Sequence, residues 1–305
     1  MFAKSILYII GTRLPKFKRI FFIAKFLFLS LIANVYAAER AYQAVLPTPN
    51  QVDIMLHVFT PPNTPKGVLI ALHGCGGLLS TNTSKGDKLS ARHAAMAQFA
   101  NNLDWVAVFP DSFSSRGRRE ICTQKFSERT IGQADRKNDV IATARWVKEQ
   151  NWQAHSSTHP AKSSLKSVLL GWSNGGTTVL QTIESPTPAD ELVDQAVAFY
   201  PGCSRQLARD YRTNVPLTLF IGGKDDWTPP KPCIALGERI GATVYVYPEA
   251  HHGFDSPVGK VRLRRDVPNG VNPGEGVHVG PHQASRDDAY EKLSRILKEL
   301  SVSVR

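Results

Sequence analysis

The segment SVLLGWSNGG, residues 167–176, decides the fold that we expect for this chain. Its first half is an apolar run of the kind found in strands that are buried on both faces of a parallel sheet. Its second half, GWSNG (171–175), follows at once and opens a segment with a helical pattern. A sharp strand-to-helix turn exposes the serine hydroxyl, and flanking glycines remove side chains that would collide there. The segment therefore predicts Ser173 as a nucleophile; the alternative is a structural serine in a tight turn.

A serine nucleophile needs a general base, and the base needs an acid that orients it. In this arrangement the acid and then the histidine follow the serine, each on a loop after a strand. The sequence offers two acids and two histidines in that order, after the apolar runs 217–223 and 243–248: Asp225, Asp226, His251 and His252. One alternative makes Asp226 a solvated turn residue or a helix cap. Another makes His251 a hydrogen-bonded loop residue.

Apolar runs alternate with helical patterns from residue 50 onward. Strands are predicted at 52–59, 68–73, 105–111, 167–173, 196–201, 217–223 and 243–248. Helices are predicted at about 86–102, 131–150, 175–184, 231–240 and 284–300. This alternation is typical of an α/β fold, with a doubly wound, mostly parallel sheet and helices on both faces. The run 52–59 alternates only in part, which indicates an edge or half-exposed strand.

The glycine-rich loop HGCGG (73–77) follows the first of the continuous apolar runs. Glycines let a backbone approach a substrate carbonyl closely. The amides of Cys75 and Asn174 are the expected donors of an oxyanion hole, each worth about 3–4 kcal/mol to the transition state. A competing hypothesis makes Cys75 the nucleophile, but this residue lacks the strand-turn-helix setting.

Six motifs make residues 50–300 resemble the dienelactone hydrolase family of α/β-hydrolases: LHGCGG (72–77), FPDSF (109–113), GWSNGG (171–176), FYPGC (199–203), GGKDDWTP (222–229) and EAHHGFDSP (249–257). The resemblance implies the α/β-hydrolase fold, and it assigns the acid to Asp225 and the base to His252. The namesake enzymes of that family use a cysteine nucleophile and a glutamate in the oxyanion loop, where this chain has Ser173 and Gly74. A Ser-His-Asp esterase mechanism through an acyl-enzyme therefore fits better than dienelactone hydrolysis.

Three aromatic residues flank the predicted triad positions: Trp172, Trp227 and Phe254. We expect them either to line a pocket for an acyl or aromatic group or to pack in the core. The arginines at 116, 118 and 119 could meet a substrate carboxylate, although an exposed loop is the favoured interpretation.

The interval 255–283 is rich in Pro and Gly and interrupts the alternation, so we interpret it as an insertion loop over one end of the sheet. Its basic residues could steer an anionic substrate, but a solvated surface is favoured: Lys260, Arg262, Arg264 and Arg265. No carboxylate–histidine pattern of a metal site accompanies His278 and His282. Neither a metal nor another cofactor is predicted.

The first 37 residues have the three parts of a secretory signal peptide. Basic residues lie between positions 4 and 19, an apolar run covers 20–33, and Val35 and Ala37 are spaced for cleavage after Ala37. The alternative, an uncleaved anchor, is disfavoured because a membrane span needs roughly 20 apolar residues. We expect an exported protein, periplasmic or secreted, whose mature part, residues 38–305, is a single α/β-hydrolase domain without a membrane span.

The positive charge of the chain comes largely from this leader. The whole sequence carries a formal charge of +11; the leader holds six Lys or Arg and no acid, so the remainder carries +5. Composition therefore gives no support for a nucleic-acid partner.

All four cysteines lie in the mature part, and an even number in an exported protein predicts disulfides. Four cysteines allow three connectivities. The order of the predicted strands places Cys75 and Cys122 on neighbouring loops, and likewise Cys203 and Cys233, which favours the pairing 75–122 with 203–233.

Three functional hypotheses remain at this point. The first is an exported hydrolase of carboxylic esters, small or oligomeric. The second keeps the triad but makes the protein an acyltransferase or a polyester hydrolase. The third is a non-catalytic binding module on the same fold, which the retained Ser-Asp-His order disfavours. The sequence names neither the ester nor the oligomeric state.

Overall fold

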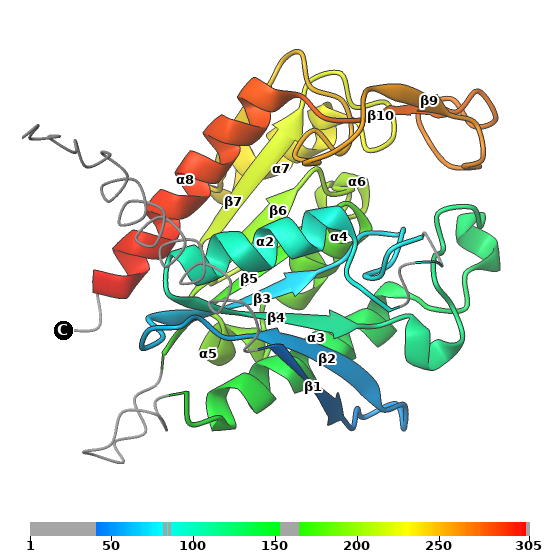
Figure 1. Ribbon diagram of the computed structural model, residues 1–305. Coiled ribbons are helices and arrows are strands. Elements are labelled where there is room, and N and C mark those ends of the chain that lie inside the picture. Colours follow the sequence, from blue (N-terminus) through cyan, green and yellow to red (C-terminus); the bar gives the residue numbers. More distant parts are fainter. Residues whose placement is uncertain (1–40, 82–83, 85–86, 153–164, 303–305) are drawn as a thin grey trace, which may run out of the picture. The chain divides into compact units, whose positions relative to one another are not determined.

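The computed structural model describes residues 41–81, 84, 87–152 and 165–302. An eight-stranded sheet with the order β1-β2-β4-β3-β5-β6-β7-β8 forms its centre (Figure 1). The strands are β1 (Ala41–Leu46), β2 (Ile54–Phe59), β3 (Gly67–Leu72), β4 (Trp105–Asp111), β5 (Lys166–Trp172), β6 (Gln195–Phe199), β7 (Leu217–Gly222) and β8 (Thr243–Tyr247). β2 pairs antiparallel with β1 and with β4, and every pairing from β4 to β8 is parallel. The predicted α/β fold with a mostly parallel sheet is confirmed.

The register of the central strands positions the site. β5 lies between β3 and β6, and Gly171 pairs with Leu72 on one side and with Ala198 on the other. Because the strands are parallel, their carboxyl ends meet at one edge of the sheet. The residues after β3, β5, β7 and β8 therefore come together there, which is where ligands bind in open α/β sheets.

Helices cover both faces of the sheet, as predicted. α2 (Ala91–Asn102) and α8 (Gln283–Val302) bury their apolar residues against one face (Figure 1). The other face is covered by α3 (Gln133–Glu149), α4 (Asn174–Thr182), α5 (Ala189–Leu192) and α7 (Pro230–Ile240). Three short helices complete the described elements: η2 (Ser114–Arg116), η3 (Phe126–Glu128) and α6 (Ser204–Leu207). Strands that are buried at every position, such as β3 and β7, need this cover on both sides.

The prediction for the start of the sheet was incomplete. β1 is the edge strand, and its sequence AYQAVL gave no strand signal because four of its six residues are exposed. The interpretation of the run 52–59 as an edge or half-exposed strand is wrong. β1 pairs with β2 on one side and β4 on the other, and Ile54, Leu56 and Val58 are fully buried.

The insertion at 255–283 contains regular structure that the prediction of a loop left out. β9 (Arg262–Arg264) and β10 (Val277–Val279) form a two-stranded antiparallel ribbon. The amide of Gly280 donates to the carbonyl of His252, and Val279 forms an isolated bridge with that residue. The ribbon is thereby attached to the loop after β8. We call residues 255–283 the excursion below.

Both disulfides have the favoured connectivity, Cys75–Cys122 and Cys203–Cys233. Among the helices in the described ranges, none has the length and apolar character needed to cross a membrane. The predicted signal peptide, residues 1–37, lies outside the described residues.

Candidate active site

Ser173 occupies a strained turn between β5 and α4. Its φ of 52° is positive, a conformation that non-glycine residues adopt rarely and mostly at functional sites. The flanking glycines are required by close backbone contacts. A Cβ on Gly171 would lie 2.4 Å from the carbonyl oxygen of Gly175, and one on Gly175 would lie 2.3 Å from that of Leu72. The motif thus holds the serine where β3, β5 and α4 meet.

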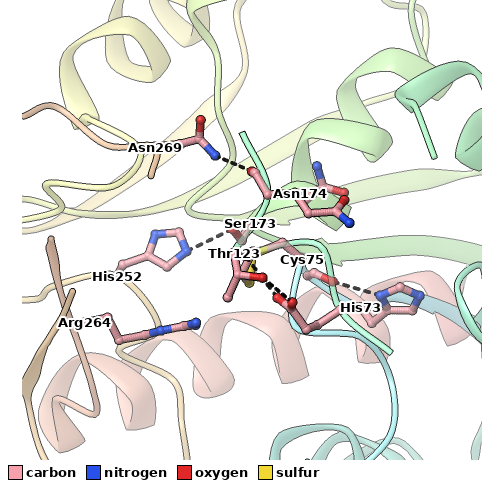
Figure 2. The surroundings of a disulfide bond; sticks show 12 residues. His73, Cys75, Thr123, Ser173, Asn174, His252, Arg264 and Asn269 are labelled. Carbon is pink, nitrogen blue, oxygen red and sulfur yellow. Dashed lines mark hydrogen bonds between the residues drawn. A yellow bond between two sulfur atoms is a disulfide. The ribbon is translucent and has the colours of Figure 1, made fainter. Parts of the chain in front are cut away.

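The predicted serine, histidine and acid come together in one chain of hydrogen bonds. Nε2 of His252 lies 2.9 Å from Oγ of Ser173 (Figure 2). Nδ1 of His252 lies 2.7 Å from Oδ2 of Asp225. The other carboxylate oxygen of Asp225 accepts the amides of Trp227 and Thr228 at 2.9 and 2.8 Å. These bonds fix the buried carboxylate, so that it can orient the histidine, which can take a proton from the serine.

The neighbouring acid and histidine lie outside this chain. Asp226 accepts hydrogen bonds from the amide and Nδ1 of His278, at 2.8 and 2.7 Å. Its side chain does not cap α7 but, while 36% exposed, anchors the excursion. Nδ1 of His251 donates to the carbonyl oxygen of Lys224 at 3.0 Å. His251 is therefore a hydrogen-bonded loop residue, the alternative given for it above.

Sequence reasoning missed Thr228, whose hydroxyl sits at the junction of the acid and the histidine. Its Oγ1 lies 2.9 Å from Oδ2 of Asp225, 3.1 Å from Nδ1 of His252 and 3.0 Å from the carbonyl oxygen of Tyr200. Tyr200 in turn packs its ring 4.6 Å from that of His252. Both residues lie in motifs that carry the family resemblance, GGKDDWTP and FYPGC, but the sequence does not show that the loops containing them meet at His252.

The loop after β3 lies against the serine. A Cβ on Gly74 would be 3.5 Å from Cβ of Ser173, and Figure 2 shows Cys75 next to the same residue. Nδ1 of His73 donates to the carbonyl oxygen of Gly74 at 2.8 Å, and its Nε2 accepts the amide of Ser112 at 3.3 Å. Burial lowers the pKa of His73 to about 3, so this side chain stays neutral. The opposite candidate donor, Asn174, is the first residue of α4.

Of the three aromatic candidates for a pocket wall, only Trp227 lies at the site. It is partly buried, with its ring 4.8 Å from that of His252. Trp172 and Phe254 are 1% and 0% exposed and belong to the core on the face of α2 and α8. The sequence left open whether these two contact the substrate or pack in the core, and the structure supports packing, because both rings lie against Phe199.

The excursion and the loop after β4 meet around the disulfide Cys75–Cys122. Nδ2 of Asn269 donates to the carbonyl oxygen of Gln124 at 2.9 Å. Val267 and Val277 pack in one cluster with both cysteines. Arg264 stacks over Trp227 at 5.4 Å and pairs with Asp266.

The arginines after FPDSF are not all exposed, contrary to the favoured interpretation. Arg116 makes a two-pronged ion pair with the buried Asp139, at 2.9 and 2.8 Å. Arg119 pairs at the surface with Asp87. Within the described ranges, no group of three or more His, Cys, Asp or Glu is placed to hold a metal ion.

Fold and site together define an α/β-hydrolase with a serine at its nucleophile turn. The chain matches the model of the dienelactone hydrolase family over residues 55–301, and it belongs to that family. It is a hydrolase that acts on ester bonds. No curated protein sequence matches the chain.

Solved structures with low sequence identity share the fold. A candidate dienelactone hydrolase from Klebsiella pneumoniae subsp. pneumoniae has a TM-score of 0.59 at 15% identity, over 85% of this chain and 98% of that one. An esterase from Pyrobaculum calidifontis has a TM-score of 0.55 at 16% identity, over 97% and 96%. Esterase 2 from Thermogutta terrifontis, in a form phosphorylated by paraoxon, has a TM-score of 0.53 at 18% identity, over 87% and 96%.

Proposed function

We propose that this protein is an exported serine esterase with Ser173, His252 and Asp225 as its catalytic triad. The observation that carries the proposal is the continuous chain of hydrogen bonds from Ser173 Oγ through His252 to Asp225, at 2.9 and 2.7 Å. A nucleophile within hydrogen-bond reach of a base, which is itself oriented by a buried acid, is the arrangement that acyl transfer needs.

The steps follow from the positions of these atoms. Nε2 of His252 takes the hydroxyl proton as Oγ of Ser173 attacks the ester carbonyl, and Asp225 stabilises the imidazolium that forms. The amides of Cys75 and Asn174 donate to the oxygen that becomes negative. The imidazolium then protonates the departing alcohol, and water, activated by His252, releases the acid from the acyl-enzyme. Trp227 borders the space beside His252 and is the candidate contact for the substrate.

A covalent probe tests the proposal directly. Paraoxon and fluorophosphonates react with activated serines, and we expect labelling of one residue, Ser173, with parallel loss of p-nitrophenyl ester hydrolysis. Ser173→Ala should be neither labelled nor active on the p-nitrophenyl ester. Ser112→Ala, which removes another buried hydroxyl near the site, should keep labelling and activity. A folded protein that is neither labelled nor active would exclude an esterase and favour a binding module. An ester panel with and without an added alcohol separates hydrolysis from acyl transfer.

Export is supported by the basic-apolar-small pattern of residues 1–37 and by two disulfides, which persist in oxidising compartments. Amino-terminal sequencing of the protein from the periplasm or the medium should begin at Ala38. An uncleaved chain recovered with the membrane fraction would instead support the anchor.

A further inference from the structure

Arg136 lies in the first turn of α3 and is 1% exposed. Its Nη1 donates to Oδ1 of Asn174 at 2.6 Å, and its Nη2 donates to the carbonyl oxygen of His73 at 2.7 Å. These acceptors belong to the two segments that carry the proposed oxyanion-hole donors, the start of α4 and the loop after β3. A single guanidinium therefore connects the start of α4 to the loop after β3.

The positive charge of Arg136 has no direct counter-ion. Among the residues that the structure describes, no carboxylate lies within ion-pairing distance of it, and its Nε has no hydrogen-bond partner. Its guanidinium also lies over the ring of Phe113, 5.2 Å from the ring centroid. A buried charge is normally paired, because removal from water is costly, so an unpaired one needs an explanation.

Two carboxylates, Asp139 and Asp111, act on Arg136 through space, and both already have other partners. Asp139 forms its two-pronged pair with Arg116. Asp111 accepts the amides of Phe113 and Ser114 and the hydroxyl of the latter. Burial lowers the pKa of Arg136 to about 10, which still leaves the side chain charged at neutral pH. The site therefore contains a fixed cation that the resting protein does not neutralise by direct contact.

The bonds of Arg136 and His73 also fix how the oxyanion loop is oriented. His73 holds the carbonyl oxygen of Gly74, and because C=O and N–H point in opposite directions across a trans peptide, the amide of Cys75 points away from His73. Arg136 holds the carbonyl oxygen of His73 itself. The peptides on both sides of Gly74 are thus held by buried side chains.

We propose that Arg136 is a positioning residue of the oxyanion hole, which holds its two donor segments together and keeps a positive charge, without a direct ion pair in the resting protein, behind the place where the substrate oxygen becomes negative. This inference rests on the proposed esterase function. An interaction that strengthens in the transition state raises kcat and leaves the binding of the ground state largely unchanged. Loss of Arg136 should therefore lower kcat and change KM little.

The test compares three variants of the enzyme: Arg136→Gln, Arg136→Lys and Thr143→Ala. Thr143 is a fully buried residue of the same helix whose hydroxyl donates within α3, to the carbonyl oxygen of Asp139, so it controls for loosening of the helix. We expect Arg136→Gln to lower kcat about 100-fold, as the loss of one oxyanion donor does, with KM within about threefold. Arg136→Lys, which keeps the charge, should recover at least part of kcat, and Thr143→Ala should keep it within about twofold.

Each outcome is decisive. Folded Arg136→Gln with kcat within threefold of the wild type would overturn the inference, as would a loss in kcat matched by Thr143→Ala at equal stability. If Arg136→Gln does not fold, the Arg136→Lys variant provides the test. If folded Arg136→Lys loses kcat about 100-fold, as expected for the neutral variant, the role of the charge is refuted. A wild-type enzyme that neither hydrolyses esters nor reacts with a fluorophosphonate would instead refute the esterase itself, so the two failures are distinguishable.

Discussion

Asp255 accepts a hydrogen bond from the indole nitrogen of Trp172 at 2.7 Å, across 83 positions of the sequence. The other oxygen of this fully buried carboxylate accepts the hydroxyl of Tyr200 at 2.5 Å and Nε of Arg92 at 3.1 Å. Arg92 also donates to the carbonyl oxygen of Gly253, next to His252. One carboxylate thus links the residue before the nucleophile, the tyrosine that packs on the histidine, and the histidine loop.

Replacing Asp255 by Asn should destabilise the protein strongly. Three donors face this carboxylate, and an amide would set its own donor against one of them while leaving Arg92 without its counter-ion. Removal of one partner of a buried pair costs about 3–5 kcal/mol. Urea unfolding should show this loss, whereas Asp266→Asn, in an exposed pair with Arg264, should change the free energy of unfolding by less than about 1 kcal/mol. Equal values for the two variants would contradict the role given to Asp255.

Substitutions of the adjacent residues Asp225 and Asp226 should have very different effects on catalytic activity. Asp225→Asn removes the acceptor at Nδ1 of His252 and should lower kcat by about 10⁴-fold, because the histidine then adopts the wrong tautomer. Asp226→Asn changes only the anchor to His278 and should keep kcat within a few-fold. Steady-state kinetics on a p-nitrophenyl ester measures both. A large loss of kcat in Asp226→Asn, with little loss in Asp225→Asn, would make Asp226 the acid of the triad.

Sequence patterns predicted the sheet well where strands are buried on both faces, since such strands need nearly continuous apolar runs. They missed β1 because an exposed edge strand needs no such run. Chain order narrowed the acid and the histidine to two doublets, and resemblance chose within each. The roles of Arg136, Thr228 and Asp255 were not predicted, because each depends on a contact between segments that are far apart in the sequence. The basic residues of the excursion illustrate the same limit, since only the fold puts Arg264 over Trp227.

The two disulfides should differ in their effect on catalysis. They join cysteines 47 and 30 positions apart, and the chain-entropy model gives each about 4 kcal/mol of stabilisation. Replacing either pair by alanines should therefore lower the free energy of unfolding by a similar amount, measured in urea. Only the Cys75/Cys122 variant should also lose kcat, by about tenfold, because Cys75 belongs to the proposed oxyanion loop. The Cys203/Cys233 variant is the control, and equal kcat values would argue against a role for the first disulfide in holding that loop.

Acid should destabilise the protein through two buried histidines. Burial lowers the pKa values of His73 and His93 to about 3, from 6.5. Below pH 6.5 the unfolded chain takes up a proton at each position while the folded protein does not, so stability falls as the pH falls toward 3. Each histidine contributes about 1.4 kcal/mol per pH unit in this window. His93→Gln should reduce the slope of the free energy of unfolding against pH between pH 6 and 4. At pH 7.5, where His93 is neutral in both states, the variant should show only the loss of stability that comes from the altered side chain. Urea unfolding at a series of pH values measures the slope, and an unchanged slope in the variant would show that His93 becomes protonated in the folded state.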